Sequence, residues 1–144
     1  MRRGILLIAL TAALTARAAA FVFEPGKPID VQALDAEQQA DIYRTWEIGD
    51  KSGKRRCRFT LLKDFTIGGY QLEKAPGCEK AFPVMDDISA WRLLEGWTVD
   101  LVDPLRKIRV RFETPDNGYV TFGDPKDIAG MDELLRIKAK PDKK

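Results

Sequence analysis

Histidine is absent from this 144-residue sequence, and its absence excludes several classes of enzyme. Triad-type serine and cysteine hydrolases need histidine as a general base, and the common zinc hydrolases need it as a metal ligand. Nucleotide-binding fingerprints of the GxGxxG and GxxxxGK(S/T) types are absent as well. Two carboxylate pairs remain, Asp86-Asp87 and Asp124 with Asp127, and turn or cap chemistry explains both better than a glycosidase dyad does. We expect no enzymatic activity, no cofactor and no metal site.

Long apolar runs are absent beyond the N-terminus. Residues 1–20, MRRGILLIALTAALTARAAA, combine two arginines, an apolar run from Ile5 to Leu14 and small residues at the end. This is the layout of a secretory signal peptide, and the run is too short for a permanent membrane anchor. An uncleaved amphipathic N-terminus is the alternative. With the signal removed, we expect a soluble monomer without a membrane anchor, located in the periplasm or secreted.

Charge of one sign is not in excess. The chain has 24 Lys and Arg against 22 Asp and Glu, and residues 1–20 hold three of the arginines and no acid. From residue 21 onward, 21 basic residues therefore face 22 acidic ones, a formal charge of −1. Such a protein has no overall field that attracts nucleic acid, so no nucleic-acid partner is expected. The basic cluster Lys51–Arg58 is interpreted as a solvated loop and the start of a strand.

Cysteine is scarce, with Cys57 and Cys78 alone. Two cysteines in an exported protein usually pair, because they fold in an oxidising compartment. A catalytic thiol would normally need a histidine base, and a zinc site would have to combine two thiols with carboxylates, which is uncommon. We predict a Cys57–Cys78 disulfide, whose loop closure is worth about 3 kcal/mol in the chain-entropy picture.

The expected signal peptide leads into an extended segment and then a helical pattern. FVFEPGKP at 21–28 contains two prolines and a glycine, which predicts an extended arm over residues 21–29. Val31, Leu34 and Ile42 are then spaced as on one face of a helix. With Asp30 or Asp35 as the N-cap, one short helix is expected over residues 30–44.

From Trp46 onward, short segments rich in aromatic and β-branched residues alternate with turn residues. In RCRFTLL the alternation directs Cys57, Phe59 and Leu61 to the core and the neighbouring arginines to solvent. KIRVRFE repeats the pattern, with Ile108, Val110 and Phe112 inward and Arg109, Arg111 and Glu113 outward. APGCEKAFPV is interpreted as a loop, PDNG at 115–118 as a hairpin turn, and DELLRIKAK as a last strand or a short helix.

About eight strands are therefore expected after one helix. An all-β fold is expected, a small eight-stranded antiparallel barrel of lipocalin-like type, because closure removes exposed strand edges. A two-sheet sandwich is the alternative. The single domain should span residues 30–140, including the helix, and residues 141–144 should form a frayed tail.

The order of landmarks TWEI, CRFTL, GGYQL, GC, ISAWRL, GWTVDLVD, IRVRF and GYVTFG, over roughly Ile42 to Gly123, resembles a known family. It resembles the exported bacterial inhibitors of serralysin-type zinc metalloproteases, the alkaline protease inhibitor family. The resemblance implies an eight-stranded antiparallel barrel with one disulfide, preceded by a helix and an arm. It places Cys57 and Cys78 at the family's disulfide positions and Trp46 and Trp91 at its core tryptophans. With the inward-facing Phe59 and Phe112, these tryptophans are the expected core.

The resemblance also implies a function and a partner. In the family the barrel docks over the cleft of a serralysin-type zinc metalloprotease, and the N-terminal arm inserts into the active site. The residues expected to contact the protease are Phe21, Val22, Phe23, Glu24 and Pro25. The new α-amine would lie near the catalytic zinc, where its ordinary pKa of about 7.7–8.0 lets a metal displace the proton.

Three other interpretations stay open. One is that residues 21–25 are a disordered apolar arm left by signal cleavage. The barrel could hold a small ligand, unless Phe59, Trp91, Trp97, Ile108 and Phe112 fill its interior. The protein could also be an envelope-interaction protein that uses the same barrel as a scaffold without inhibiting a protease.

Overall fold

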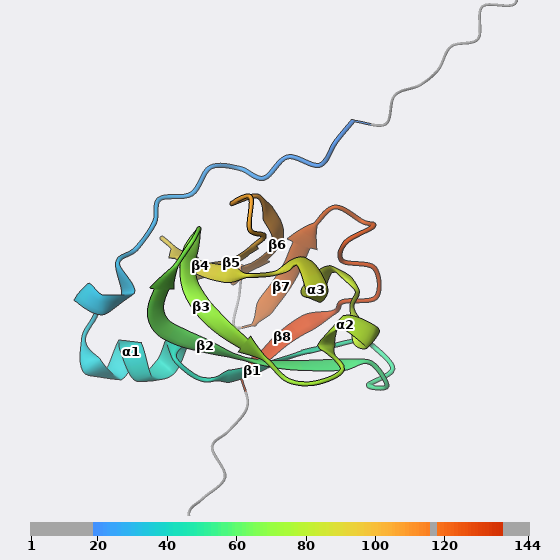
Figure 1. The fold of residues 1–144 in the computed structure, drawn as a ribbon, viewed down its shortest axis with the longest axis horizontal. Coiled ribbons are helices and arrows are strands. Elements are labelled where there is room, and N and C mark those ends of the chain that lie inside the picture. Colours follow the sequence, from blue (N-terminus) through green and yellow to red (C-terminus); the bar gives the residue numbers. More distant parts are fainter. Residues whose placement is uncertain (1–18, 116–117, 137–144) are drawn as a thin grey trace, which may run out of the picture.

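The computed structural model describes residues 19–115 and 118–136 (Figure 1). Residues 1–18 of the expected signal peptide and the expected tail at 141–144 lie outside the described residues, as do two residues of the expected PDNG turn. Within the described part of the chain, none of the helices has the length and apolar character needed to cross a membrane.

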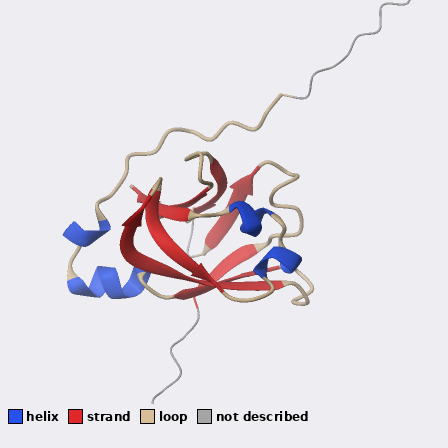
Figure 2. Ribbon diagram, in the orientation of Figure 1, coloured by secondary structure: helices blue, strands red, loops and turns tan. Residues whose placement is uncertain are grey.

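Eight antiparallel strands form a closed barrel, which confirms the expected fold class and excludes the two-sheet sandwich. Each strand pairs with the next along the chain, and β8 returns to pair with β1. Figure 2 shows the strands curving around a common interior, with the helices at the margin of the barrel. The strands are β1 (Thr45–Gly49), β2 (Arg56–Thr66), β3 (Gly69–Lys74), β4 (Ala90–Leu94), β5 (Thr98–Val102), β6 (Ile108–Glu113), β7 (Tyr119–Gly123) and β8 (Glu133–Arg136).

The strand alternation read from the sequence matches the observed burial in β2. Cys57, Phe59 and Leu61 are each about 1% exposed, whereas Arg56 and Arg58 are exposed. Phe59, Trp91 and Phe112 are among the largest fully buried side chains, and Trp46 lies in the same cluster at 4% exposure. The barrel interior is therefore filled with side chains.

Two of the five residues considered as interior filling are not part of the buried core. Trp97 belongs to the turn between β4 and β5, where it is 36% exposed and has a positive φ of 59°. It follows Gly96, also at positive φ, so the turn chemistry and not the strand alternation decides where its side chain lies. Ile108, at the start of β6, is half-buried. The buried core contains Phe59, Trp91 and Phe112 but neither of these two residues.

The N-terminal helix differs from the single helix expected over residues 30–44. The chain forms a 3-10 turn over Val31–Ala33 and then α1 over Ala36–Ile42. Both candidate caps are used, because Asp30 caps the 3-10 turn and Asp35 caps α1 through a capping box with Gln38. The backbone between the two is extended at Leu34 and Asp35, which separates the two helical segments.

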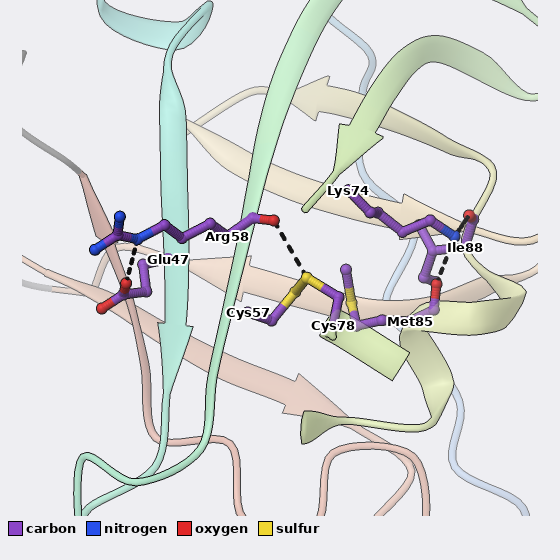
Figure 3. Close-up of a disulfide and its surroundings, with 7 residues drawn as sticks. All are labelled: Glu47, Cys57, Arg58, Lys74, Cys78, Met85 and Ile88. Atoms are coloured by element: carbon purple, nitrogen blue, oxygen red, sulfur yellow. Dashed lines mark hydrogen bonds and ion pairs between the residues drawn. A yellow bond between two sulfur atoms is a disulfide. The ribbon is translucent and has the colours of Figure 1, made fainter. Parts of the chain in front are cut away.

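The predicted disulfide is confirmed. Cys57 in β2 is bonded to Cys78, the first residue of the short helix α2 (Cys78–Ala81) (Figure 3). The segment between β3 and β4, expected as a loop, contains α2 and a second short helix, α3 (Val84–Asp87). Lys74 at the end of β3 holds this segment, because its ammonium group donates to the carbonyl oxygens of Met85 at 2.7 Å and Ile88 at 2.9 Å (Figure 3).

Candidate functional site

The N-terminal arm, residues 21–29, lies across the outside of the barrel (Figure 1). Its second half pairs with β4. The amide of Ile29 donates to the carbonyl oxygen of Leu93 at 2.9 Å, and the amide of Glu95 donates to the carbonyl oxygen of Lys27 at 2.9 Å. Pro28 and Leu94 form the antiparallel bridge between these bonds. The arm is therefore part of the sheet hydrogen-bonding network from Lys27 onward.

This pairing is available because β3 leaves part of the β4 edge free. β3 and β4 are in register at one position, Tyr70 opposite Trp91. β3 does not extend along the rest of β4, and the arm takes this edge instead. Gly26 lies so close to the Leu94 side chain that a side chain at residue 26 would displace it. Leu94 faces outward yet is only 4% exposed.

The first half of the arm is held by Arg111 on β6. The Arg111 guanidinium makes two bonds to the Asp100 carboxylate on β5, at 2.6 and 2.9 Å, and both side chains are at most 5% exposed. It also donates to the carbonyl oxygen of Glu24 at 2.6 Å and lies 5.3 Å from the ring centroid of Phe23. The hydrogen bonds with Asp100 raise the pKa of Arg111 further, so it is charged at every accessible pH.

Beyond Phe23 the arm is apolar and exposed. Phe21 is 43% exposed and Val22 is 81% exposed, and the rings of Phe21 and Phe23 meet edge to face with centroids 4.8 Å apart. Of the five residues expected to contact a protease, Phe23 is partly covered by the barrel and the other four are exposed. The arm therefore has two parts. Residues 23–29 are seated on β4 and β6, and Phe21 and Val22 project beyond this seat.

The three arginines of the basic cluster Lys51–Arg58 have structural partners, whereas its two lysines lie in the exposed turn before β2. Glu47 on β1 is 2% exposed and lies between Arg56 and Arg58, with 2.7 Å between its carboxylate and the Nε of Arg58. Arg55 donates to the carbonyl oxygen of Ala81 at 2.7 Å, and its guanidinium lies over the ring of Phe82. The charges that surround Cys57 in the sequence therefore stabilise the β1–β2 pair and the α2 segment.

A cavity of about 400 Å³ opens beside α1 at the end of the barrel that carries the β4–β5 and β6–β7 turns. Its apolar lining comes from α1, the strand ends and the β4–β5 turn, with Gln38 and Asp41 as polar members. The apolar residues are Ile42, Trp46, Trp97, Tyr119, Leu134 and Leu135. Among the described residues, no three Cys, Asp or Glu side chains are grouped so that they could hold a metal ion.

Arg111, Asp100 and Leu94 are site residues that sequence reasoning did not identify. The alternation of KIRVRFE predicts an outward Arg111, but the side chain is only 4% exposed because it pairs with Asp100 and the arm covers it. Nothing in that segment indicated the covering arm. The one local signal is Asp100, an acidic residue inside the apolar stretch WTVDLV. A charge at such a position usually has a partner when it is buried.

Comparison with known proteins identifies the family. No curated protein and no solved structure matches the chain. The model of the family described as protease inhibitor Inh matches residues 36–124, more than half of the chain. The match runs from the first residue of α1 to the residue after β7, so it includes the disulfide and seven strands but not the arm. The chain belongs to the protease inhibitor Inh family.

Proposed function

We propose that this protein inhibits a zinc metalloprotease of the serralysin type, with the barrel docked on the protease and the N-terminal arm inserted into the active-site cleft. Family membership supports a protease as the partner. The metalloprotease class rests on the landmark resemblance, which extends over the barrel. Insertion of the arm is supported by its geometry, because its base is held on β4 and β6 while its apolar end projects from the barrel.

The geometry of the arm suits insertion for a physical reason. A peptide that enters a protease cleft loses backbone freedom, which costs about 1–2 kcal/mol per residue. The hydrogen bonds of Ile29 with Leu93 in β4 and of Lys27 with Glu95, the residue after β4, order the base of the arm before the protease binds. Less entropy is then lost on binding, which favours a tight complex. The exposed Phe21 and Val22 are apolar groups that a protease subsite would bury.

We also propose that the protein acts in the periplasm or after secretion, as a soluble monomer. Two observations support export. Residues 1–20 have the layout of a signal peptide, and the Cys57–Cys78 disulfide suits an oxidising compartment. N-terminal sequencing of the exported protein would test this proposal and would show which residue carries the free α-amine.

The test is inhibition of a purified serralysin-type protease by the exported protein, compared with a form that lacks residues 21–25. The intact protein should inhibit, and the truncated form should inhibit at least tenfold more weakly. Val22→Asp should weaken inhibition as well, because it places a charge on the projecting arm. Leu105→Asp is the matched control, since Leu105 is 87% exposed but lies in the turn between β5 and β6.

Undiminished inhibition by the truncated form would contradict arm insertion. Inhibition of a serine protease but not of the metalloprotease would overturn the metalloprotease class. A stable envelope partner that is not a protease, recovered with the exported protein in the absence of any inhibition, would favour the scaffold function.

Binding of a small apolar ligand is a second candidate, favoured by the cavity of about 400 Å³ beside α1. This volume is within the range of known ligand sites. Trp46 and Trp97 line the cavity, so a ligand there should change tryptophan fluorescence. Titration with apolar ligands tests this candidate, and Trp97→Phe should reduce the response. A screen without any response would count against ligand binding.

A further inference from the structure

Two arginines on the outer face of β6 form the same kind of ion pair but in different surroundings. Arg109 binds both carboxylate oxygens of Asp127 at 2.9 and 3.0 Å, and its other neighbours are the acidic side chains Asp87 and Asp103. Arg111 binds both oxygens of Asp100 and, in addition, reaches the N-terminal arm. The Arg111 and Asp100 side chains are nearly inaccessible, at 5% and 1% exposure, whereas those of Arg109 and Asp127 are 20% and 25% exposed.

Arg111 contacts the arm with both the edge and the face of its guanidinium group. The edge of the guanidinium donates from Nη1 to the carbonyl oxygen of Glu24 at 2.6 Å. Its face lies over the ring of Phe23, with 5.3 Å from Cζ to the ring centroid. Asp100 occupies the Nε and Nη2 positions, which fixes the plane of the guanidinium before the arm binds to it.

We propose that Arg111, oriented by Asp100, is a positioning residue for the inhibitory arm. It holds Phe23 and Glu24 on the barrel, so that the segment before Phe23 is the part presented to the protease. This inference rests on the proposed function. It reduces the set of residues expected to enter the protease cleft from five to two, Phe21 and Val22. A chain that starts at Phe21 has two residues beyond the seat, which reach about 7 Å when extended.

The reach has a consequence for what the arm recognises. A two-residue projection fills two adjacent subsites of a cleft, and both projecting side chains are apolar. The partner should therefore have an apolar subsite that accepts an aromatic residue beside one that accepts a β-branched residue. Release of Arg111 from the arm would lengthen the projection but would also restore the freedom that the seat removes.

The experiment measures arm order and inhibition separately on the exported protein. Backbone ¹⁵N heteronuclear NOE values report motion of the arm on the picosecond to nanosecond scale without any protease. In the unmodified protein, Phe23 and Glu24 should give values close to those of β6, and Val22 should give a lower one. In R111M the values of Phe23 and Glu24 should fall to that of Val22, and inhibition should weaken on the order of 10- to 100-fold.

Two variants keep the test independent of folding. R109M is the matched control, because it breaks the equivalent ion pair on the same strand face without touching the arm. It should leave the NOE values of Phe23 and Glu24 unchanged. F23A removes the ring contact but leaves the Arg111–Asp100 pair, so it should loosen the arm in a fully folded barrel even if R111M does not fold.

The outcomes are distinguishable. If Phe23 and Glu24 are as mobile as Val22 in the unmodified protein, or if F23A and a folded R111M leave them ordered, the positioning role is wrong, whatever the inhibition assay shows. If the arm loosens as expected but no form of the protein inhibits a metalloprotease, the seat exists and the proposed function fails. Loosening together with weaker inhibition supports both.

Discussion

Tyr70 and Trp91 form the single paired position between β3 and β4. Side chains compensate for the short ladder at this joint. The indole nitrogen of Trp91 donates to the carbonyl oxygens of Leu62 at 3.1 Å and Gln71 at 2.9 Å.

The hydroxyl of Tyr70 connects this position to the N-terminal segment. It donates to the Asp30 carboxylate at 3.2 Å and accepts a hydrogen bond from the backbone amide of Val31, also at 3.2 Å. The joint therefore ties the barrel to the segment that leads out of the arm.

The first prediction concerns close approach of the backbones at this joint. A methyl group at Gly69 would meet the carbonyl oxygen of Trp91, which is backbone and cannot turn away. Gly69→Ala should therefore push β3 and β4 apart and lower the free energy of unfolding by roughly 1–3 kcal/mol. Denaturant unfolding followed by tryptophan fluorescence measures this.

Gly49→Ala is the control for that substitution. Gly49 is also a terminal residue of a strand, and a methyl group there would meet no atom within 4 Å. Its unfolding free energy should stay within about 0.5 kcal/mol of the unmodified protein. If both variants lost the same unfolding free energy, the close contact at Gly69 would not be the cause of the loss.

The second prediction concerns the disulfide. Cys57 and Cys78 are 21 residues apart, and loop closure of that length stabilises a protein by about 3 kcal/mol in the chain-entropy model. The Cys57→Ala, Cys78→Ala double variant should lose about that much unfolding free energy. Because α2 begins at Cys78, amides in α2 and α3 should also exchange faster with solvent.

A reductant provides the comparison for the double variant. It should destabilise the unmodified protein by a similar amount and leave the double variant unchanged. If the double variant were as stable as the oxidised protein, the contacts of Lys74 with Met85 and Ile88 would be sufficient to hold the segment without the covalent bond.

The sequence predicted the barrel well because its signals are local. Inward and outward positions follow from alternation within each strand, and Cys57 and Phe59 show it in β2. The two caps Asp30 and Asp35 were also identified, but not that each would cap a separate helical segment. The choice between one helix and two depends on the extended backbone at Leu34, for which the side-chain pattern gives no signal.

The arm seat was not predictable for a different reason. Arg111 binds the carbonyl oxygen of Glu24, which lies 87 residues earlier in the chain. Alternation places Arg111 outside the barrel, and solvent exposure is the ordinary consequence of that position. Its burial depends on where the arm crosses the barrel, and this in turn depends on the free edge of β4. Neither property is encoded in a periodic pattern.

The third prediction concerns acid stability through Glu47. Burial alone would raise the pKa of this carboxyl group, but hydrogen bonds from Arg58 and Arg56 outweigh burial and lower its pKa below the ordinary 4.5. The unfolded state then binds the proton more readily than the folded state. The stabilisation is therefore fully present above pH 4.5 and is lost as the pH falls through the lower pKa of the folded protein.

Glu47→Gln should accordingly be less stable than the unmodified protein at neutral pH, by roughly 1–3 kcal/mol, because a charged hydrogen-bond acceptor is replaced by a neutral one. The difference should shrink as the pH is lowered below 4.5, since the glutamate itself becomes neutral. Unfolding midpoints at several pH values measure this. A difference that stayed constant with pH would contradict the pKa direction.

The fourth prediction separates the three tryptophans by their exposure. Trp91 is fully buried and Trp46 is 4% exposed, whereas Trp97 is 36% exposed at the rim of the cavity beside α1. Iodide is charged and does not enter a packed interior, so it should quench the emission of Trp97 and leave the other two nearly untouched. Trp97→Phe should remove the quenchable fraction and shift the remaining emission to shorter wavelength.

Trp46→Phe is the control, because the Trp46 side chain packs in the core. This variant should leave the quenchable fraction in place. Quenching that survived in Trp97→Phe would mean that the barrel opens near Trp46, and the side chains of the interior would then be accessible to solvent.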